Sequence, residues 1–145
     1  MTKSPAAKPL GFARHGARIG LGAFLGFAGV SHLTFAREEF RSQVPDFVPL
    51  DPDLTVLLSG VAEIGLGLSL LALVRKRVAV GWIAALFFVA VFPGNFAQWQ
   101  EGRDAFGLDT DGKRLTRLFF QPVLIALALW STAAWRDRAQ LRSKA

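Results

Sequence analysis

Five side chains of this 145-residue sequence could carry proton exchange or strong hydrogen bonds inside an otherwise apolar setting. Glu63 is an acid within an apolar stretch, and in a bilayer span an acid is disfavoured by about 2.5 to 3.5 kcal/mol. Such a group usually pairs, stays protonated or lines a wet cavity. His32, Asn95 and Gln121 occupy three other apolar stretches, and Arg117 stands one turn before Gln121. We expect these five side chains to form one network between helices, with Glu63 at its centre and Arg117 capping it from the outer side.

The sequence allows two interpretations of this network. As a ligand site, its nitrogen donors would bind the carbonyl oxygens of a quinone in an apolar slot while Glu63 exchanges a proton. As a packing device, it would only fix the helix register, because interhelical hydrogen bonds contribute about 0.6 to 2 kcal/mol each. A metal site is not expected, since one histidine and one acid are too few ligands, and haem would need a second histidine within a span.

The elements that must position these residues are four charge-poor stretches. Residues 19–36, 78–100 and 118–135 contain no Asp, Glu, Lys or Arg, and residues 54–74 contain only Glu63. About 20 apolar helical residues cross a hydrocarbon core of about 30 Å. The sequence therefore predicts an all-α fold, a single domain over 1–145 that forms a four-transmembrane-helix bundle. The expected spans are about 17–36, 54–74, 78–98 and 117–135, with tails at 1–16 and 136–145.

Charge and tryptophan patterns predict the orientation of the spans. Most of the 17 Lys and Arg residues precede the first span, form the connection 75–77 or follow the last span, whereas most of the 11 acids lie in the other two connections. Short cytoplasmic segments are enriched in Lys and Arg, so both termini should face the cytoplasm. Trp82 and Trp135 should lie near the inner boundary and Trp130 deeper.

The sequence also makes predictions for the two acidic connections and for the contacts between helices. Residues 37–53 mix apolar residues, charges and prolines, which predicts a segment along the interface with one short helix. Residues 101–114 read as a solvated loop. Small residues in the first three spans predict close helix packing. Pro93, followed by Gly94 and Asn95, should kink the third helix and leave a carbonyl in need of a partner.

Several functions are excluded or disfavoured by composition. The chain has no Cys, which excludes disulfides, thiol nucleophiles, thiolate zinc sites and iron–sulfur clusters. The net charge of +6 does not predict nucleic-acid binding, because the basic residues flank apolar spans and form no stripe on a soluble face. No phosphate-binding, nucleophile-elbow or kinase motif is present. We therefore do not expect the chain to catalyse a reaction alone.

Four short motifs, in this order, resemble the DoxX-like family of small bacterial integral membrane proteins over roughly residues 17–136. The Val44-Pro45 and Phe47-Val48-Pro49 stretches also look like that family. The four motifs are Gly29-Val30-Ser31-His32, Ser59-Gly60-Val61-Ala62-Glu63-Ile64-Gly65, Pro93-Gly94-Asn95 and Arg117-Leu118-Phe119-Phe120-Gln121-Pro122.

The resemblance implies a four-helix bundle in the bacterial inner membrane and an association with membrane redox chemistry, because the name-giving member is a subunit of a thiosulfate:quinone oxidoreductase. The expected function is an accessory or quinone-contacting membrane subunit, with the lipid bilayer, a redox enzyme subunit and further copies of the chain as partners. Two alternatives stay open. One is an assembly protein that docks a partner on residues 37–53. The other is a small proton-coupled transporter that uses Glu63.

Overall fold

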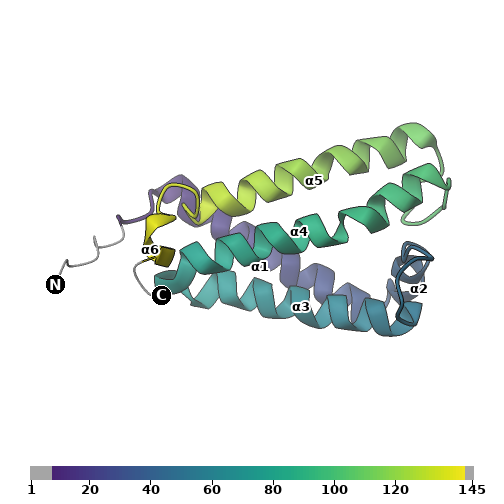
Figure 1. The fold of residues 1–145 in the computed structure, drawn as a ribbon, viewed down its shortest axis with the longest axis horizontal. Helices are drawn as coiled ribbons and strands as arrows, with labels where there is room; N and C mark the ends of the chain where they lie inside the picture. Colours follow the sequence, from purple (N-terminus) through teal and green to yellow (C-terminus); the bar gives the residue numbers. More distant parts are fainter. Residues whose placement is uncertain (1–7, 143–145) are drawn as a thin grey trace.

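The computed structural model describes residues 8–142, and every regular element in that range is helical. Four long helices run along the molecule, with both described chain ends at one end, here called the terminal end (Figure 1). A short helix and the 101–110 loop lie at the opposite end, here called the α2 end (Figure 1). This confirms the all-α prediction with four main helices. The elements are α1 (Phe12–Leu33), α2 (Arg37–Arg41), α3 (Pro52–Ala72), the 3₁₀ turn η1 (Val74–Lys76), α4 (Arg77–Gln100), α5 (Asp111–Ser131) and α6 (Ala139–Arg142).

The helix ends differ from the expected span ends. α5 begins at Asp111 because the Thr110 hydroxyl accepts a hydrogen bond from the Lys113 amide, so the connection predicted over 101–114 is a loop only to residue 110. α1 stops at Leu33 and α5 at Ser131, before their charge-free stretches end. The helical parts of these stretches, 19–33 and 118–131, are therefore only about 22 and 21 Å long.

Two helical segments are long and apolar enough to cross a membrane. They are Pro52–Ala72 and Val74–Gln100, which correspond to the second and third expected spans. The first and fourth expected spans fall short because α1 begins with arginines and the first two turns of α5 carry Asp111, Lys113, Arg114 and Arg117. Membrane crossing by α1 and α5 therefore remains a prediction.

α1 and α3 pack backbone to backbone through glycines. A Cβ atom on Gly29 would lie 2.5 Å from the Gly60 carbonyl oxygen, and one on Gly67 would lie 2.6 Å from the Gly22 carbonyl oxygen. Any side chain at these positions would push the helices apart, as expected for helix pairs joined by small residues. α4 and α5 form the second extensive pair, and Gly81 of α4 is equally confined, by Thr132 at the end of α5.

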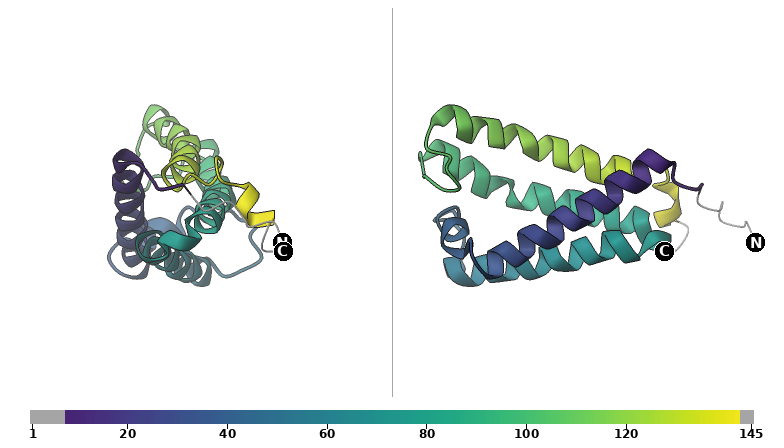
Figure 2. Two further views of the ribbon diagram at one scale, coloured as in Figure 1. Left: turned by 90° about the vertical axis from the view of Figure 1, so that its left-hand side faces the viewer. Right: turned by 180° about the vertical axis from the view of Figure 1, so that it is seen from behind.

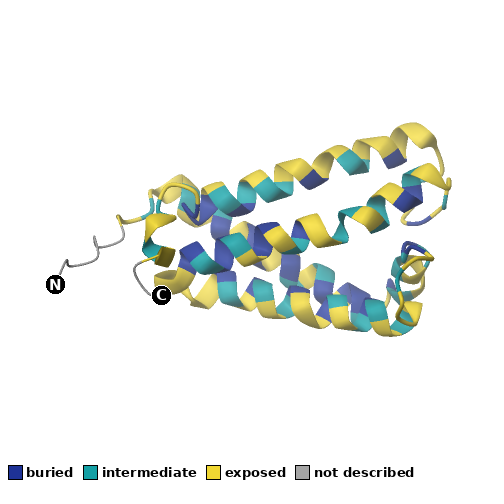
Figure 3. Cartoon of the chain, viewed as in Figure 1, coloured by how far each residue is buried: buried dark blue, intermediate teal, exposed yellow. Residues whose placement is uncertain are grey.

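α1 crosses the bundle diagonally. It lies beside α5 at the terminal end and beside α2 and α3 at the α2 end (Figure 2). The buried apolar core consequently fills the terminal half, where Leu21 and Leu25 of α1 meet Leu70, Ala84 and Ala128. The buried residues face the interior of the bundle, and the outward faces of the helices are exposed along their length (Figure 3).

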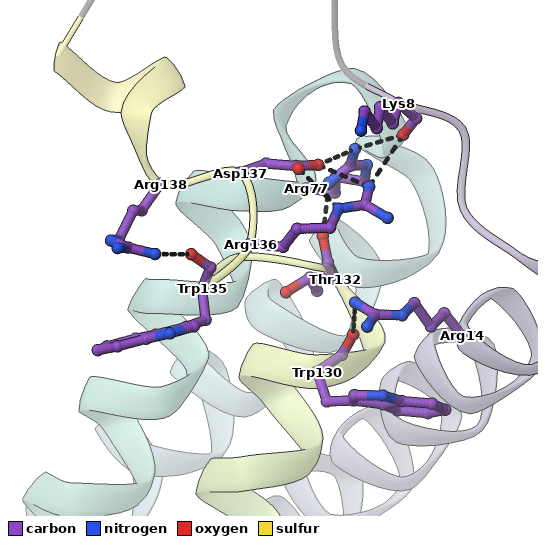
Figure 4. Close-up of polar contacts among 9 residues, drawn as sticks. All are labelled: Lys8, Arg14, Arg77, Trp130, Thr132, Trp135, Arg136, Asp137 and Arg138. Atoms are coloured by element: carbon purple, nitrogen blue, oxygen red, sulfur yellow. Dashed lines mark hydrogen bonds and ion pairs between the residues drawn. The ribbon is translucent and has the colours of Figure 1, made fainter.

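Arg77 joins four segments at the terminal end (Figure 4). Its buried guanidinium donates to the Thr132 carbonyl at 2.7 Å, the Lys8 carbonyl at 2.9 Å and the Asp137 carboxylate at 2.7 Å. The start of α4 is thereby connected to the end of α5 and to both flanking segments. From the sequence, Arg77 is only the last residue of the basic connection 75–77.

Trp130 also lies at the terminal end, not deeper in the bundle as expected. The Arg14 guanidinium stands 5.2 Å from the centre of the Trp130 ring and donates to the Trp130 carbonyl at 3.0 Å (Figure 4). The difference arises because α5 ends at Ser131, so Trp130 belongs to its last turn. Trp82 and Trp135 pack together with ring centres 5.9 Å apart.

The Asp137 pairing predicts an acid-dependent loss of stability. Hydrogen bonds from Arg136, and then from Arg77, lower the pKa of Asp137 to about 2. A carboxyl with a lower pKa in the folded state stabilises the fold above its unfolded pKa of about 3.9, and this contribution disappears as the pH falls toward 2. The melting temperature of the purified protein in mild detergent should therefore fall more steeply between pH 4 and pH 2 than that of Asp137→Asn. Asp46→Asn, at an exposed carboxylate, should behave as the wild type; equal slopes for wild type and Asp137→Asn would contradict the assignment.

Candidate functional site

A cavity of about 920 Å³ occupies the half of the bundle near the α2 end. Residues of α1 and α3 form one side, residues of α4 and α5 the other, and the 37–53 connection and Phe106 contribute at the α2 end. This volume is within the range of cavities that hold small molecules. All five side chains singled out in the sequence line this cavity: His32, Glu63, Asn95, Arg117 and Gln121.

Most of the cavity wall is apolar and aromatic. Phe87 and Phe88 of α4 line it from one side, with Phe88 fully part of the core. Phe24 and Phe27 of α1 and Phe120 of α5 also line it, and each is at least half exposed at the molecular surface. The cavity therefore has an apolar rim between α1 and α5.

Glu63 of α3 and His32 of α1 meet in this cavity. The Nδ1 atom of His32 lies 2.9 Å from Oε2 of Glu63, and both side chains are more than nine-tenths buried. Their meeting depends on Gly60, one turn before Glu63, because a Cβ atom there would lie 2.8 Å from the Cβ of His32. The glycine contact between α1 and α3 thus brings the histidine to the acid.

The Glu63 carboxylate accepts no hydrogen bond from the described residues. The Nδ1 atom of His32 lies 2.8 Å from the Ala28 carbonyl oxygen and bonds to it, so that neither carboxylate oxygen of Glu63 accepts a hydrogen bond from the described residues. Nε2 of His32 likewise has no partner in residues 8–142. A buried carboxylate without hydrogen bonds is costly, and here it faces a cavity large enough for a ligand or water.

A chain of ring contacts connects His32 to the loop 101–110. Phe40 of α2 stacks on the imidazole with ring centres 3.3 Å apart, and Phe106 meets Phe40 edge-on at 4.6 Å. The Arg117 guanidinium lies 5.0 Å from the centre of the Phe106 ring, within cation–π range. Phe106 also has a positive φ of 55°, a conformation uncommon for a side chain of this size.

Arg117 forms a second polar cluster with two glutamines that the sequence analysis did not select. Its Nη atoms donate to Gln98 at 3.1 Å and to Gln43 at 3.2 Å, and Gln43 donates to Gln98 at 3.1 Å. Both glutamines are buried. Gln98 could have been noticed, because it lies one turn beyond Asn95 in a charge-free stretch. Gln43 gave no such signal, since its place depends on the path of the 37–53 connection.

The single network centred on Glu63 is therefore not what the structure shows. Of the other four side chains, only His32 forms a polar contact with Glu63, because the two helix pairs separate here and the cavity lies between them. Gln121 donates across to the Phe88 carbonyl at 2.9 Å. α4 continues through Pro93, which has no N–H to donate to the Val89 carbonyl. The Phe88 carbonyl, which Gln121 binds, belongs to the neighbouring residue. Asn95 is partly exposed and has no side-chain partner among residues 8–142.

No group of three or more His, Cys, Asp or Glu side chains within the described range is arranged to hold a metal ion. The predicted 37–53 segment does contain one short helix, α2, as expected. What the arrangement offers chemically is a carboxylate with an imidazole at one place and a guanidinium with two amides at another, in one apolar cavity.

Fold and site together define an all-helical protein with a ligand-sized cavity between two helix pairs. The chain belongs to a family described as a domain of unknown function, DUF8561, whose model matches residues 21–132. That range contains every residue that lines the cavity. The match gives no DoxX assignment, so that resemblance remains a prediction. Comparison with curated proteins and with solved structures gave no match.

The Ala28 contact predicts the tautomer of His32. A carbonyl oxygen only accepts hydrogen bonds, so the proton of the neutral imidazole should be on Nδ1, leaving Nε2 as an acceptor toward the cavity. Nitrogen-15 NMR of histidine-labelled protein should show this form, and His15→Gln would leave His32 as the sole signal. A neutral His32 protonated on Nε2 would contradict the placement.

Proposed function

We propose that this chain is a four-span membrane protein that binds a lipophilic molecule with an oxygen-bearing head group in the cavity near the α2 end. One observation carries the proposal: the buried Glu63 carboxylate and its histidine neighbour have unused hydrogen-bonding capacity and face about 920 Å³ of space with largely apolar walls. Cavities of this kind, apolar with a few converging polar groups, are typical of small-molecule sites.

The outward faces of the helices support residence in a bilayer. Phe27 on α1 and Phe119 on α5 are 65% and 66% exposed, although α1 and α5 are the helices with shorter apolar stretches. A soluble monomer rarely exposes contiguous apolar surface of this extent. Similar exposed residues cover α3 and α4, namely Leu58, Val61, Leu68, Ile83, Leu86 and Val89.

The arginines of α1 and α5 do not oppose this proposal, because they bind protein groups. Arg18 is 2% exposed and donates to the carbonyls of Leu70 and Leu71 at the end of α3. Arg117 donates to the two glutamines. Buried polar partners are how charged side chains are tolerated at membrane depth. Basic residues gather at the terminal end, which supports an orientation in the bacterial inner membrane with both termini inside.

A quinone fits the residues of the cavity as a candidate ligand. Its carbonyl oxygens accept hydrogen bonds, and Asn95 and Arg117 could donate them, while Gln121 is partly engaged by Phe88. When bound, a quinone would supply two-electron redox chemistry. The chain would bind and orient it, exclude water and hold a proton at the free oxygen of Glu63. With the DoxX-like resemblance, this supports a role as a quinone-contacting or accessory membrane subunit beside an oxidoreductase.

Single cysteines test the topology against a background without native cysteine. Asp109→Cys, in the exposed loop at the α2 end, should react with a membrane-impermeant maleimide on intact cells. Lys76→Cys, exposed at the terminal end, should react only after the membrane is permeabilised. Equal labelling of both variants in intact cells, or recovery of the protein in the soluble fraction, would contradict the four-span arrangement.

Ligand binding is tested with protein purified in mild detergent. Mass spectrometry of the extracted lipid should detect a quinone, and an added short-chain quinone should raise the melting temperature. Glu63→Gln should weaken this binding by roughly 3- to 10-fold, the size expected for one hydrogen bond. Glu38→Gln, at an exposed carboxylate of α2, is the control. If no quinone copurifies, none stabilises the protein and affinity purification returns no redox enzyme, the redox role fails.

A further inference from the structure

Arg117 differs from all other basic side chains at the α2 end. Among the described residues it makes no ion pair: its hydrogen bonds go to glutamine oxygens, and its guanidinium lies over the Phe106 ring. The five other basic residues there each pair with a carboxylate: Arg37 with Asp53, Arg41 with Glu38, Arg103 with Glu101 and Asp46, Lys113 with Asp109, and Arg114 with Asp104 and Asp111. The charge of Arg117 is thus left unbalanced where acids are plentiful.

The unbalanced charge lines the cavity. Arg117 is the only Lys or Arg among the residues that line it, within the described part of the chain. A guanidinium has five N–H donors, and two hydrogen bonds are made here, so three donors are unused. Removing a cation from water without an anionic partner is costly. Guanidinium groups bind carboxylates and phosphates through paired hydrogen bonds.

Two acids, Glu39 and Glu63, also line the cavity, and among the described residues neither forms an ion pair with Arg117. Glu63 lies against His32, with Oε2 2.9 Å from Nδ1. Glu39 also lines the cavity, but its carboxylate accepts a hydrogen bond from the Phe106 amide at 2.7 Å. Gln43 and Gln98 hold the guanidinium in position without neutralising it, since an amide oxygen carries no net charge. The site therefore keeps a positioned cation available at the α2 end of an apolar cavity.

We infer that the ligand of this cavity is an anionic amphiphile, a single-chain lipid with a carboxylate or phosphate head group bound by Arg117. Its hydrocarbon chain would pack against the phenylalanine walls and pass between α1 and α5 at the rim formed by Phe24, Phe27 and Phe120. This inference rests on the proposed function, that the cavity holds a lipophilic molecule. It narrows the head group from a neutral oxygen acceptor, such as a quinone carbonyl, to an anion.

The test compares ligands that share a twelve-carbon chain and differ in the head group, two anionic and one neutral. Dodecanoate, dodecyl phosphate and methyl dodecanoate would be titrated into the full-length protein in a neutral detergent at pH 8.5, where both acids are ionised. Binding would be measured by calorimetry and by the shift in melting temperature. We expect at least one of the two anions to bind the wild type 10-fold or more tighter than the ester, and the anion that does so identifies the head group.

Four variants assign this preference to Arg117. Arg117→Gln should lose the preference for the anion over the ester, whereas Arg117→Lys should keep part of it. Arg114→Gln is the matched control, because Arg114 lies one turn away and is paired with two acids. Gln43→Glu leaves Arg117 in place and supplies the missing carboxylate, so it should also remove the preference, and it serves if Arg117→Gln does not fold.

The outcomes separate this inference from the proposed function. Equal binding of anions and ester by the wild type, or a preference that persists in both Arg117→Gln and Gln43→Glu, would overturn the anionic ligand while leaving a lipophilic ligand in place. Binding of a neutral quinone alone would have the same meaning. If neither the anions, the ester nor a quinone binds, the proposed function itself fails.

Discussion

The close approach of α1 to α3 is the constraint on which the rest of the structure depends. Glycines at positions 22, 29, 60 and 67 let the two backbones touch, and no larger residue fits at the tightest contacts. The same approach places His32 against Glu63, since Gly60 leaves room for the histidine. Helix packing and the polar site are therefore one feature, and a side chain at position 60 would disturb both.

The diagonal course of α1 explains why the apolar core fills the terminal end and the cavity lies near the α2 end. At the terminal end α1 reaches α5, the core is filled, and Arg77 ties the chain ends together. At the α2 end α1 lies against α3 and α2 and away from α5, so α4 and α5 have no full partner on that side (Figure 2). The 37–53 connection and Phe106 cover part of the space. The packed core and the Arg77 contacts at the terminal end hold the helices together, so the α2 end can contain a cavity.

The sequence predicted the helical class, the approximate helices and the five polar residues that share one cavity, because apolar periodicity and isolated polar residues are local signals. It did not predict which of those residues touch. Of the other four, only His32 forms a polar contact with Glu63, because the remaining three belong to α4 and α5 on the other side of the cavity. The separation of the helix pairs depends on the crossing of α1, which no local pattern encodes. Gln43, Phe40 and Phe106 were missed for a similar reason: their positions follow from how two connections fold back over the bundle. The start of α5 at Asp111 does have a local signal in the sequence, the capping residue Thr110.

The cavity is lined by an acidic residue, Glu63, and a basic residue, Arg117, that do not form an ion pair. An ion pair between Glu63 and Arg117 would be the simplest way to satisfy both charges, and it would close the space between the helix pairs. Instead, Arg117 is bound by two buried glutamines and Glu63 lies beside a histidine that Phe40 stacks upon. Buried polar groups held apart in this way contribute little to the stability of the fold. Under the proposed function a ligand would complete the arrangement, with its head group reaching the guanidinium and its apolar body filling the space between the two charges.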